Sequence, residues 1–239
     1  MSRFFFHPSL MVEETILLSS EESHHLLVER IKPGSLVLLC DGKGNLFQGV
    51  YEKEHKGKAQ ISVEEKIGEE KKNLDLIVWQ AMLKSPSRLD WLVEKLTEIG
   101  VSQIGFFFPH NSLKNVISRE KKERWEKIIL SACKQSGRTI FPDLILLEQW
   151  EDFVSSLSNS RGTVVLADPE GDKTIWSFLK DQKERSFQIV IGPEGDLTKE
   201  EKEEILQKGK GVKLSTKILR SETASLFCAS VVASFLESE

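Results

Sequence analysis

Residues 189–198 read Ile-Val-Ile-Gly-Pro-Glu-Gly-Asp-Leu-Thr. The apolar run predicts the end of a buried strand, and Thr198 followed by Lys-Glu-Glu has the pattern of a helix capping box. In an open α/β sheet, ligands bind beyond the carboxyl ends of such strands, and glycines let the backbone approach them closely. The stretch lacks the Gly-Lys-Ser/Thr ending of a phosphate-binding loop. Spacing alone also fits a structural turn without a ligand.

A second stretch repeats this arrangement near the C-terminus. Residues 214–224 read Leu-Ser-Thr-Lys-Ile-Leu-Arg-Ser-Glu-Thr-Ala, so a strand end again leads through a polar turn into a helix. The cluster of charged and hydroxyl side chains is typical of a functional loop. Helix capping by Ser221 or Thr223, with an exposed pair between Arg220 and Glu222, explains the same residues without a ligand.

The chain between these stretches and residue 74 alternates between strand-like and helix-like segments. Apolar residues recur at helical spacing in 89–99 and 125–133, and Gly100 and Gly137 end the two helices. Further helices are predicted at 198–208 and 222–236, and strands at 74–80, 101–108, 163–167, 188–191 and 212–214. Apolar strands alternating with helices predict a parallel α/β sheet with helices on both faces.

Residues 1–63 have a different pattern of apolar residues and turns. Short apolar segments at 36–39, 46–51 and 59–63 are joined by glycine-rich turns, which predicts a small β-barrel, with a short helix at 23–30. Residues 64–73 are almost wholly polar and are interpreted as a linker or an exposed hairpin end. We therefore expect two domains, 1–70 and 74–239.

Composition excludes several classes of protein. With 239 residues, 39% hydrophobic and 29% charged, the chain is neither disordered nor collagen-like. It has no apolar run of the roughly 18 residues that a membrane helix needs, and its N-terminal apolar stretch is too short for a signal peptide, so we expect a cytoplasmic protein. The 3 cysteines are widely spaced, which favours buried thiols over disulfides, and no metal site is expected.

The overall charge argues mildly against a nucleic-acid partner. The net charge is −4 and the isoelectric point about 5.9, whereas nucleic-acid-binding domains are usually basic. A local basic face could still form from Lys84, Arg88, Lys114, Arg119, Lys134 and Arg138. These cations alternate with glutamates, so a solvated surface of mixed charge is the simpler interpretation.

Five segments, in this order, resemble one known family. They are 1–5 (Met-Ser-Arg-Phe-Phe), 25–30, 82–84 with 91–101 (Trp-Leu-Val-Glu-Lys-Leu-Thr-Glu-Ile-Gly-Val), 133–138 (Cys-Lys-Gln-Ser-Gly-Arg), and the two strand-end stretches above. The sequence is similar to the bacterial 16S ribosomal RNA (uracil-N3) methyltransferases, the RsmE family of the SPOUT class. The likeness covers nearly the whole chain, and its most specific part is the pairing of 192–195 with 218–224.

The resemblance implies a PUA-like RNA-binding barrel over 1–70, followed by a SPOUT domain with a C-terminal deep trefoil knot over 74–239. It also implies a homodimer, S-adenosylmethionine as methyl donor, and 16S ribosomal RNA or the small ribosomal subunit as substrate. The residues that would cradle the donor are Leu166, Ala167, Asp168, Ile191, Gly192, Pro193, Glu194, Gly195, Leu214, Ser215, Lys217, Ile218, Leu219 and Thr223. Asp196 and Ser215 stand where the family usually has glycine, and Glu29 where it usually has an apolar residue.

The reaction implied by the family suggests two catalytic candidates. Uracil N3 carries a proton on the base-pairing edge, so the base must be unpaired or flipped before it reacts. Arg220 would stabilise the negative charge that develops on the ring. Glu222 would either accept the proton or orient Arg220. The proposed RNA contacts are Arg3, Arg30, Lys84, Arg88 and Arg138.

Alternative functions remain open from the sequence. A SPOUT methyltransferase for another RNA position would have the same loops. A non-catalytic RNA-binding assembly factor would explain the bulkier Asp196 and Ser215. A nucleotide hydrolase is disfavoured because no lysine is placed to bind phosphate.

Overall fold

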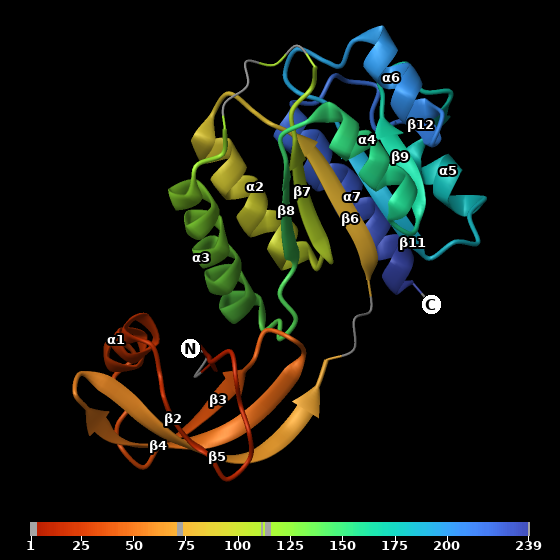
Figure 1. Ribbon diagram of the computed structural model, residues 1–239. Coiled ribbons are helices and arrows are strands. Elements are labelled where there is room, and N and C mark those ends of the chain that lie inside the picture. Colours follow the sequence, from red (N-terminus) through yellow and green to blue (C-terminus); the bar gives the residue numbers. More distant parts are fainter. Residues whose placement is uncertain (1–3, 71–73, 111, 113–115, 239) are drawn as a thin grey trace. The chain divides into compact units, whose positions relative to one another are not determined.

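The computed structural model describes residues 4–70, 74–110, 112 and 116–238 (Figure 1). It divides into two compact units. The first comprises Met1–Lys72 together with Leu130–Phe141, and the second comprises Asn73–Ile129 and Pro142–Glu239.

The first unit contains a five-stranded sheet in the order β1-β3-β4-β5-β2. Its elements are β1 (Phe4–Phe6), β2 (Thr15–Leu17), α1 (Ser20–Val28), β3 (Leu36–Cys40), β4 (Asn45–His55) and β5 (Lys58–Glu69). β1 is parallel to β3, and the other neighbours are antiparallel. The polar residues 64–69 continue β5 alongside β4 because their backbone pairs there while most of their side chains are exposed.

Residues 130–141 belong to the first unit through two acidic side chains, the exposed Glu70 and the buried Glu22. Glu70 Oε2 accepts hydrogen bonds from Thr139 N at 2.6 Å and from Ile140 N at 3.1 Å. Lys134 Nζ lies 2.8 Å from Glu22 Oε1, and Glu22 Oε2 also accepts from Phe6 N. Lys134, a candidate for a basic face, is therefore engaged in a largely buried ion pair, and losing either partner would leave a charge without compensation.

The second unit is a seven-stranded sheet in the order β10-β12-β9-β11-β6-β7-β8, and all its neighbouring strands are parallel. Its strands are β6 (Asp75–Ala81), β7 (Gln103–Phe107), β8 (Asp143–Leu147), β9 (Thr163–Ala167), β10 (Lys173–Thr174), β11 (Ser186–Ile191) and β12 (Gly209–Lys213). Its helices are α2 (Pro86–Ile99), the first part of α3 (Arg119–Ser136), α4 (Trp150–Asn159), α5 (Ile175–Lys180), α6 (Lys199–Leu206) and α7 (Ser221–Glu237). The predicted parallel α/β architecture is confirmed.

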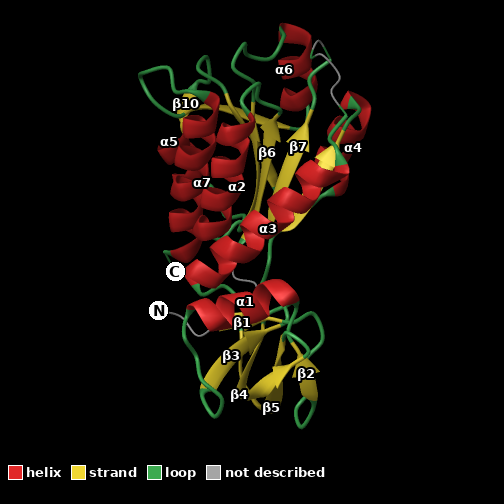
Figure 2. Ribbon diagram, turned by 90° about the vertical axis from the view of Figure 1, so that its left-hand side faces the viewer, coloured by secondary structure: helices red, strands yellow, loops and turns green. Residues whose placement is uncertain are grey.

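Helices cover both faces of this sheet because its strands are apolar on both sides. Along β6, Trp79 belongs to the core under α4 and α6 and stacks edge-on against Phe153, whereas Gln80 contacts the start of α7. Helices α5, α7, α2 and α3 lie over the opposite face (Figure 2). No helix in the described ranges is long and apolar enough to cross a bilayer.

Local patterns predicted most elements of the second unit. β9 spans the predicted residues, α2 ends at Gly100 in the left-handed conformation, and the capping box of Thr198 and Glu201 is present. β8, α4, β10 and α5 were not predicted. The trefoil knot stays a prediction.

One close backbone contact within the sheet is testable. Gly105 in β7 is paired with Trp79 in β6, and a Cβ at Gly105 would overlap the buried indole ring. We expect Gly105→Ala to lower the free energy of unfolding by about 1–3 kcal/mol through overpacking, measured by thermal denaturation. Gly68→Ala is the matched control, because its Cβ would lie 3.8 Å from Leu46. Equal melting temperatures for the two variants would contradict this account.

Candidate functional site

Three adjacent parallel strands, β12, β9 and β11, end at the same edge of the sheet, and their following loops enclose a cavity of about 680 Å³. That volume is within the usual range for small-molecule sites. Its walls are Arg88, Ala167, Asp168, Pro169, Ile191, Gly192, Pro193, Glu194, Gly195, Asp196, Leu214, Ser215, Lys217, Ile218, Leu219, Arg220, Ser221 and Ala224. The two stretches singled out from the sequence thus meet in space.

Hydrogen bonds among its own residues fix the conformation of the turn that follows β11. Asp196 has a φ of 66°, in the left-handed region that glycine adopts without strain and aspartate tolerates better than most residues. Its N–H donates to the carbonyl of Pro193 at 3.2 Å, and its Oδ1 accepts from Leu197 N at 2.8 Å. Leu197 is buried, which anchors the turn ahead of α6. The left-handed conformation is one that glycine would adopt here without strain.

The start of α7 is tied to the ends of β11 and β6 by the Ser221 hydroxyl. Ser221 Oγ donates to the carbonyl oxygen of Gly192 at 2.5 Å and accepts from Gln80 Nε2 at 2.8 Å. Since β12 and β6 are separated by two strands, residues 214–220 must cross the ends of β9 and β11 to reach this point. That crossing places Leu219 and Arg220 in the cavity wall.

A lysine joins two carboxylates on one side of the cavity. Lys202 Nζ on α6 lies 2.8 Å from Asp196 Oδ2 and 3.2 Å from Asp168 Oδ1. Burial lowers the pKa of Lys202, but hydrogen bonds and charges from the two aspartates outweigh it, so the pKa is raised. Asp168 is 7% exposed, and Lys202 compensates its charge.

The cavity offers backbone groups to a ligand. Within the part of the chain that the structure describes, the N–H groups of Ile218 and Leu219 make no hydrogen bond. An added Cβ at Gly195 would meet no atom within 4 Å, so the space beside that backbone is open. Ile218 is 92% exposed at the rim, which is unusual for a large apolar side chain. Free N–H groups beside an apolar surface fit a flat heterocycle with polar edges.

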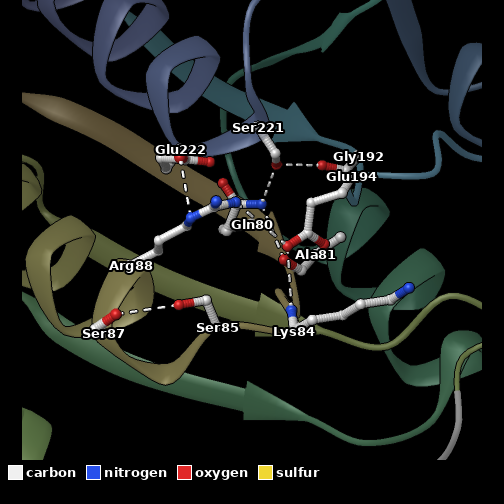
Figure 3. A network of polar contacts seen from close by, with 10 residues as sticks. All are labelled: Gln80, Ala81, Lys84, Ser85, Ser87, Arg88, Gly192, Glu194, Ser221 and Glu222. Atoms are coloured by element: carbon white, nitrogen blue, oxygen red, sulfur yellow. Dashed lines mark hydrogen bonds and ion pairs between the residues drawn. The ribbon is translucent and has the colours of Figure 1, made fainter.

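The two catalytic candidates, Arg220 and Glu222, have different surroundings, and Figure 3 shows those of Glu222. Arg220 is exposed in the cavity wall and has no ion-pair partner among the described residues. Glu222 is buried, and its Oε1 lies 3.5 Å from Arg88 Nε. Glu222 therefore pairs with Arg88, and no ion pair in the described chain joins it to Arg220. Its Oε2 is buried without a hydrogen-bond partner.

Most of the predicted donor-binding residues line the cavity, and two do not. Leu166 is a buried strand residue in the core under α4 and α6. Thr223 lines a second hollow, formed by α5 and α7. Four residues that line the cavity, Pro169, Asp196, Ser221 and Ala224, were absent from all the predicted sets of site residues. Nothing in their local sequence marks Pro169 or Ala224, because only the crossing of the loops brings them to the cavity.

The predicted RNA contacts are divided between the units. Arg30 and Arg138 belong to the first unit, and Lys84 and Arg88 to the second, while Arg3 lies outside the described residues. Arg30 and Lys84 are exposed. The pKa of Arg138 is lowered by burial, which outweighs the charges of Cys133 and Glu70. Lys114, considered for a basic face, also lies outside the described residues.

The cysteine and carboxylate side chains of the described residues were compared with the ligand sets that metals need. Among the described residues, no group of three or more His, Cys, Asp or Glu side chains is placed to hold a metal ion. Burial raises the pKa of Cys40, Cys133 and Cys228 to about 12, so none of these thiols is activated at neutral pH.

The fold is that of an RNA methyltransferase: the family model described as an RNA methyltransferase domain matches residues 70–233, and an RNA methyltransferase PUA domain matches 18–64. Small subunit ribosomal RNA methyltransferase E of Mesomycoplasma hyopneumoniae is 31% identical, with 95% of this chain and 96% of that protein covered. The Bacillus subtilis enzyme of the same name is 28% identical, with coverage of 98% and 96%. The chain belongs to the ribosomal RNA small subunit methyltransferase E family, as the sequence resemblance indicated.

A solved structure has the same fold. The methyltransferase E of Neisseria gonorrhoeae, crystallised with S-adenosyl methionine bound, superposes with a TM-score of 0.84 at 23% identity, covering 98% of both chains.

The left-handed turn yields a test at Asp196. Alanine at a φ of 66° is strained by about 1–2 kcal/mol, whereas glycine is not. The exposed ion pair with Lys202 contributes at most about 1 kcal/mol. We therefore expect Asp196→Ala to lower the thermal unfolding midpoint more than Asp196→Gly does. Both variants lose the ion pair equally, so the reverse order would show that strain at this φ does not govern the stability of the turn.

Proposed function

We propose that this protein transfers a methyl group from S-adenosylmethionine to N3 of one uridine in 16S ribosomal RNA, acting on the RNA or on the small ribosomal subunit in the cytoplasm. The observation that carries the proposal is the meeting of the 192–196 turn and the 214–220 loop around one cavity, in a chain of the methyltransferase E family. The methyl donor bound by the Neisseria relative is of a size and polarity that this cavity suits.

The two parts of the sequence have separate tasks in this proposal. Residues 1–70 form the PUA-like part that helps to bind RNA, and residues 74–239 form the SPOUT methyltransferase domain with its knotted C-terminal segment. The match of a PUA model to residues 18–64 supports the first assignment. The second is supported by the parallel sheet and by the crossing of residues 214–220 over two strand ends.

The donor is held mainly by backbone in this proposal. The segments 191–195 and 214–219 face it from two sides, with Ala167 and Asp168 at the end of β9. When bound, S-adenosylmethionine supplies a methyl group on a sulfonium, and the S–C bond breaks with its electron pair going to sulfur. The protein's task is then to align the acceptor base and to remove water from the site.

Arg220 and Glu222 handle the charge and the proton of the acceptor base. N3–H of the uracil gives its proton to Glu222 Oε2, which is a buried acceptor without a partner, and the nitrogen lone pair forms the new N–C bond. Arg220, which has no ion pair among the described residues, stabilises the negative charge that develops on the ring oxygens. Arg3, Arg30, Lys84, Arg88 and Arg138 remain proposed RNA contacts, whose binding should weaken as salt rises.

Two measurements test the proposed function: detection of N3-methyluridine in 16S RNA, and the methyl-transfer rate of an Arg220 variant. Mass spectrometry of 16S RNA should find one N3-methyluridine in cells with the protein and unmodified uridine without it. In vitro, Arg220→Ala should lower kcat by roughly 100- to 1000-fold, the usual cost of removing one charge-stabilising donor.

Arg161→Ala is the matched control for this measurement. Arg161 is exposed ahead of β9, at the amino edge of the sheet and away from the cavity. Methyl transfer at the wild-type rate by Arg220→Ala would remove this residue from the mechanism. If 16S RNA from cells that lack the protein carried the same methylated uridine as RNA from cells that have it, the proposed function would be refuted.

We also propose that the protein is a homodimer that uses the α5–α7 face. The second hollow, of about 480 Å³, is lined by residues of these two helices: Trp176, Thr223, Leu226, Phe227, Ser230, Val231 and Ser234. Trp176 is 56% and Phe227 41% exposed, and large exposed aromatic side chains grouped with small residues suit close helix packing against a second copy.

Charge placed on this face should separate the copies. We expect the wild type to sediment as a dimer and Phe227→Glu to shift the equilibrium towards monomer, because burying an unpaired carboxylate costs several kcal/mol. Ile67→Glu, at a side chain of similar exposure (43%) on β5, is the control. Sedimentation of the wild type as a monomer at micromolar concentration would rule out the dimer.

A further inference from the structure

Arg88 contacts two acidic side chains that come from different loops of the cavity (Figure 3). Its Nε lies 3.5 Å from Glu222 Oε1 at the start of α7, and its Nη1 lies 3.9 Å from Glu194 Oε1 in the turn after β11. Glu194 Oε1 also accepts from Lys84 N at 3.2 Å. Arg88 thus links the first turn of α2 to both stretches that enclose the cavity.

Arginine suits this place because its guanidinium is a rigid fork with several donors. One nitrogen faces each carboxylate, which a lysine ammonium on a flexible stem cannot do from a fixed position. The Arg88 side chain is 37% exposed, so it is only partly available to solvent, whereas that of Glu222 is 11% exposed. The arrangement leaves Glu222 with one oxygen near a cation and the other, Oε2, without a partner.

We infer that Arg88 is a positioning residue, which holds Glu194 in the cavity wall and Glu222 in the first turn of α7, and so fixes Oε2 of Glu222 as the proton acceptor. The inference rests on the proposed function for the reaction that it serves. It gives Arg88 this task in place of the contact with RNA that was proposed above. A phosphate contact and a positioning residue affect different kinetic constants, so the two tasks can be separated.

The test compares Arg88→Met and Arg88→Lys with the wild type in the full-length protein. Arg124→Met is the matched control, because Arg124 on α3 forms a 2.8 Å ion pair with Asp90 on α2. The measurements are kcat, KM for RNA and for S-adenosylmethionine, the salt dependence of RNA binding, and hydrogen–deuterium exchange of segments 192–198 and 221–226 without ligand.

For positioning, Arg88→Met should lower kcat by roughly 10- to 100-fold, the scale set by a small misplacement of a reacting group. KM for RNA and the salt slope should stay near the wild-type values. Hydrogen–deuterium exchange should quicken in both segments for Arg88→Met and in neither for Arg124→Met.

Arg88→Lys should keep RNA binding and recover only part of kcat. In a Glu222→Gln background, Arg88→Met should have little further effect on kcat, because the charge that it holds is gone.

Other outcomes would overturn the inference. A higher KM for RNA and a salt slope reduced by about 1, with kcat unchanged, would make Arg88 a phosphate contact only. Unchanged exchange in both segments would show that Arg88 does not hold these loops, whether or not the protein is active. An inactive wild type would instead refute the proposed function, and the exchange data would still decide the role of Arg88 in positioning.

Discussion

The hydroxyl of Ser221 makes two hydrogen bonds, one to the carbonyl of Gly192 and one from the amide of Gln80. Through them the start of α7 is fixed at the ends of β11 and β6, which are neighbouring strands. Because β12 lies two strands away from β6, fixing α7 there forces residues 214–220 across the sheet edge. The cavity, the place of Arg220 and the burial of Glu222 all depend on this attachment.

Around the cavity of the second unit, one cation lies between two anions at two places. Lys202 lies between Asp168 and Asp196, and Arg88 between Glu194 and Glu222. Each cation links residues from different loops, so these pairs fix the shape of the wall more than they stabilise the fold. Arg220 stands apart, with no ion pair in the described chain. In a protein of net charge −4, an arginine without an ion pair at a cavity is available to a developing negative charge.

Sequence patterns predicted the elements whose signals are local. The five residues of β9 form a continuous apolar run, and the capping box at Thr198 needs only a side chain three residues away. Other elements depend on distant partners. β1 has three residues and exists because it pairs with β3, and β10 has two and pairs with β12. The segment 130–141 begins inside α3, whose first part belongs to the second unit, yet the segment belongs to the first unit because Glu70 and Glu22 bind it there.

The sequence by itself determined the class of fold, the family and the two loops that form the site. Apolar periodicity, glycine turns and caps act over a few residues and can be recognised without coordinates. Only the tertiary structure decided which side chains share a space: Arg88 with Glu222 rather than Arg220 with Glu222, Lys202 with two aspartates, and Thr223 in the hollow of α5 and α7 and not in the cavity. The reason is that neighbours in sequence at a strand end or on a helix point in different directions, whereas parallel strands bring residues from distant segments to one edge.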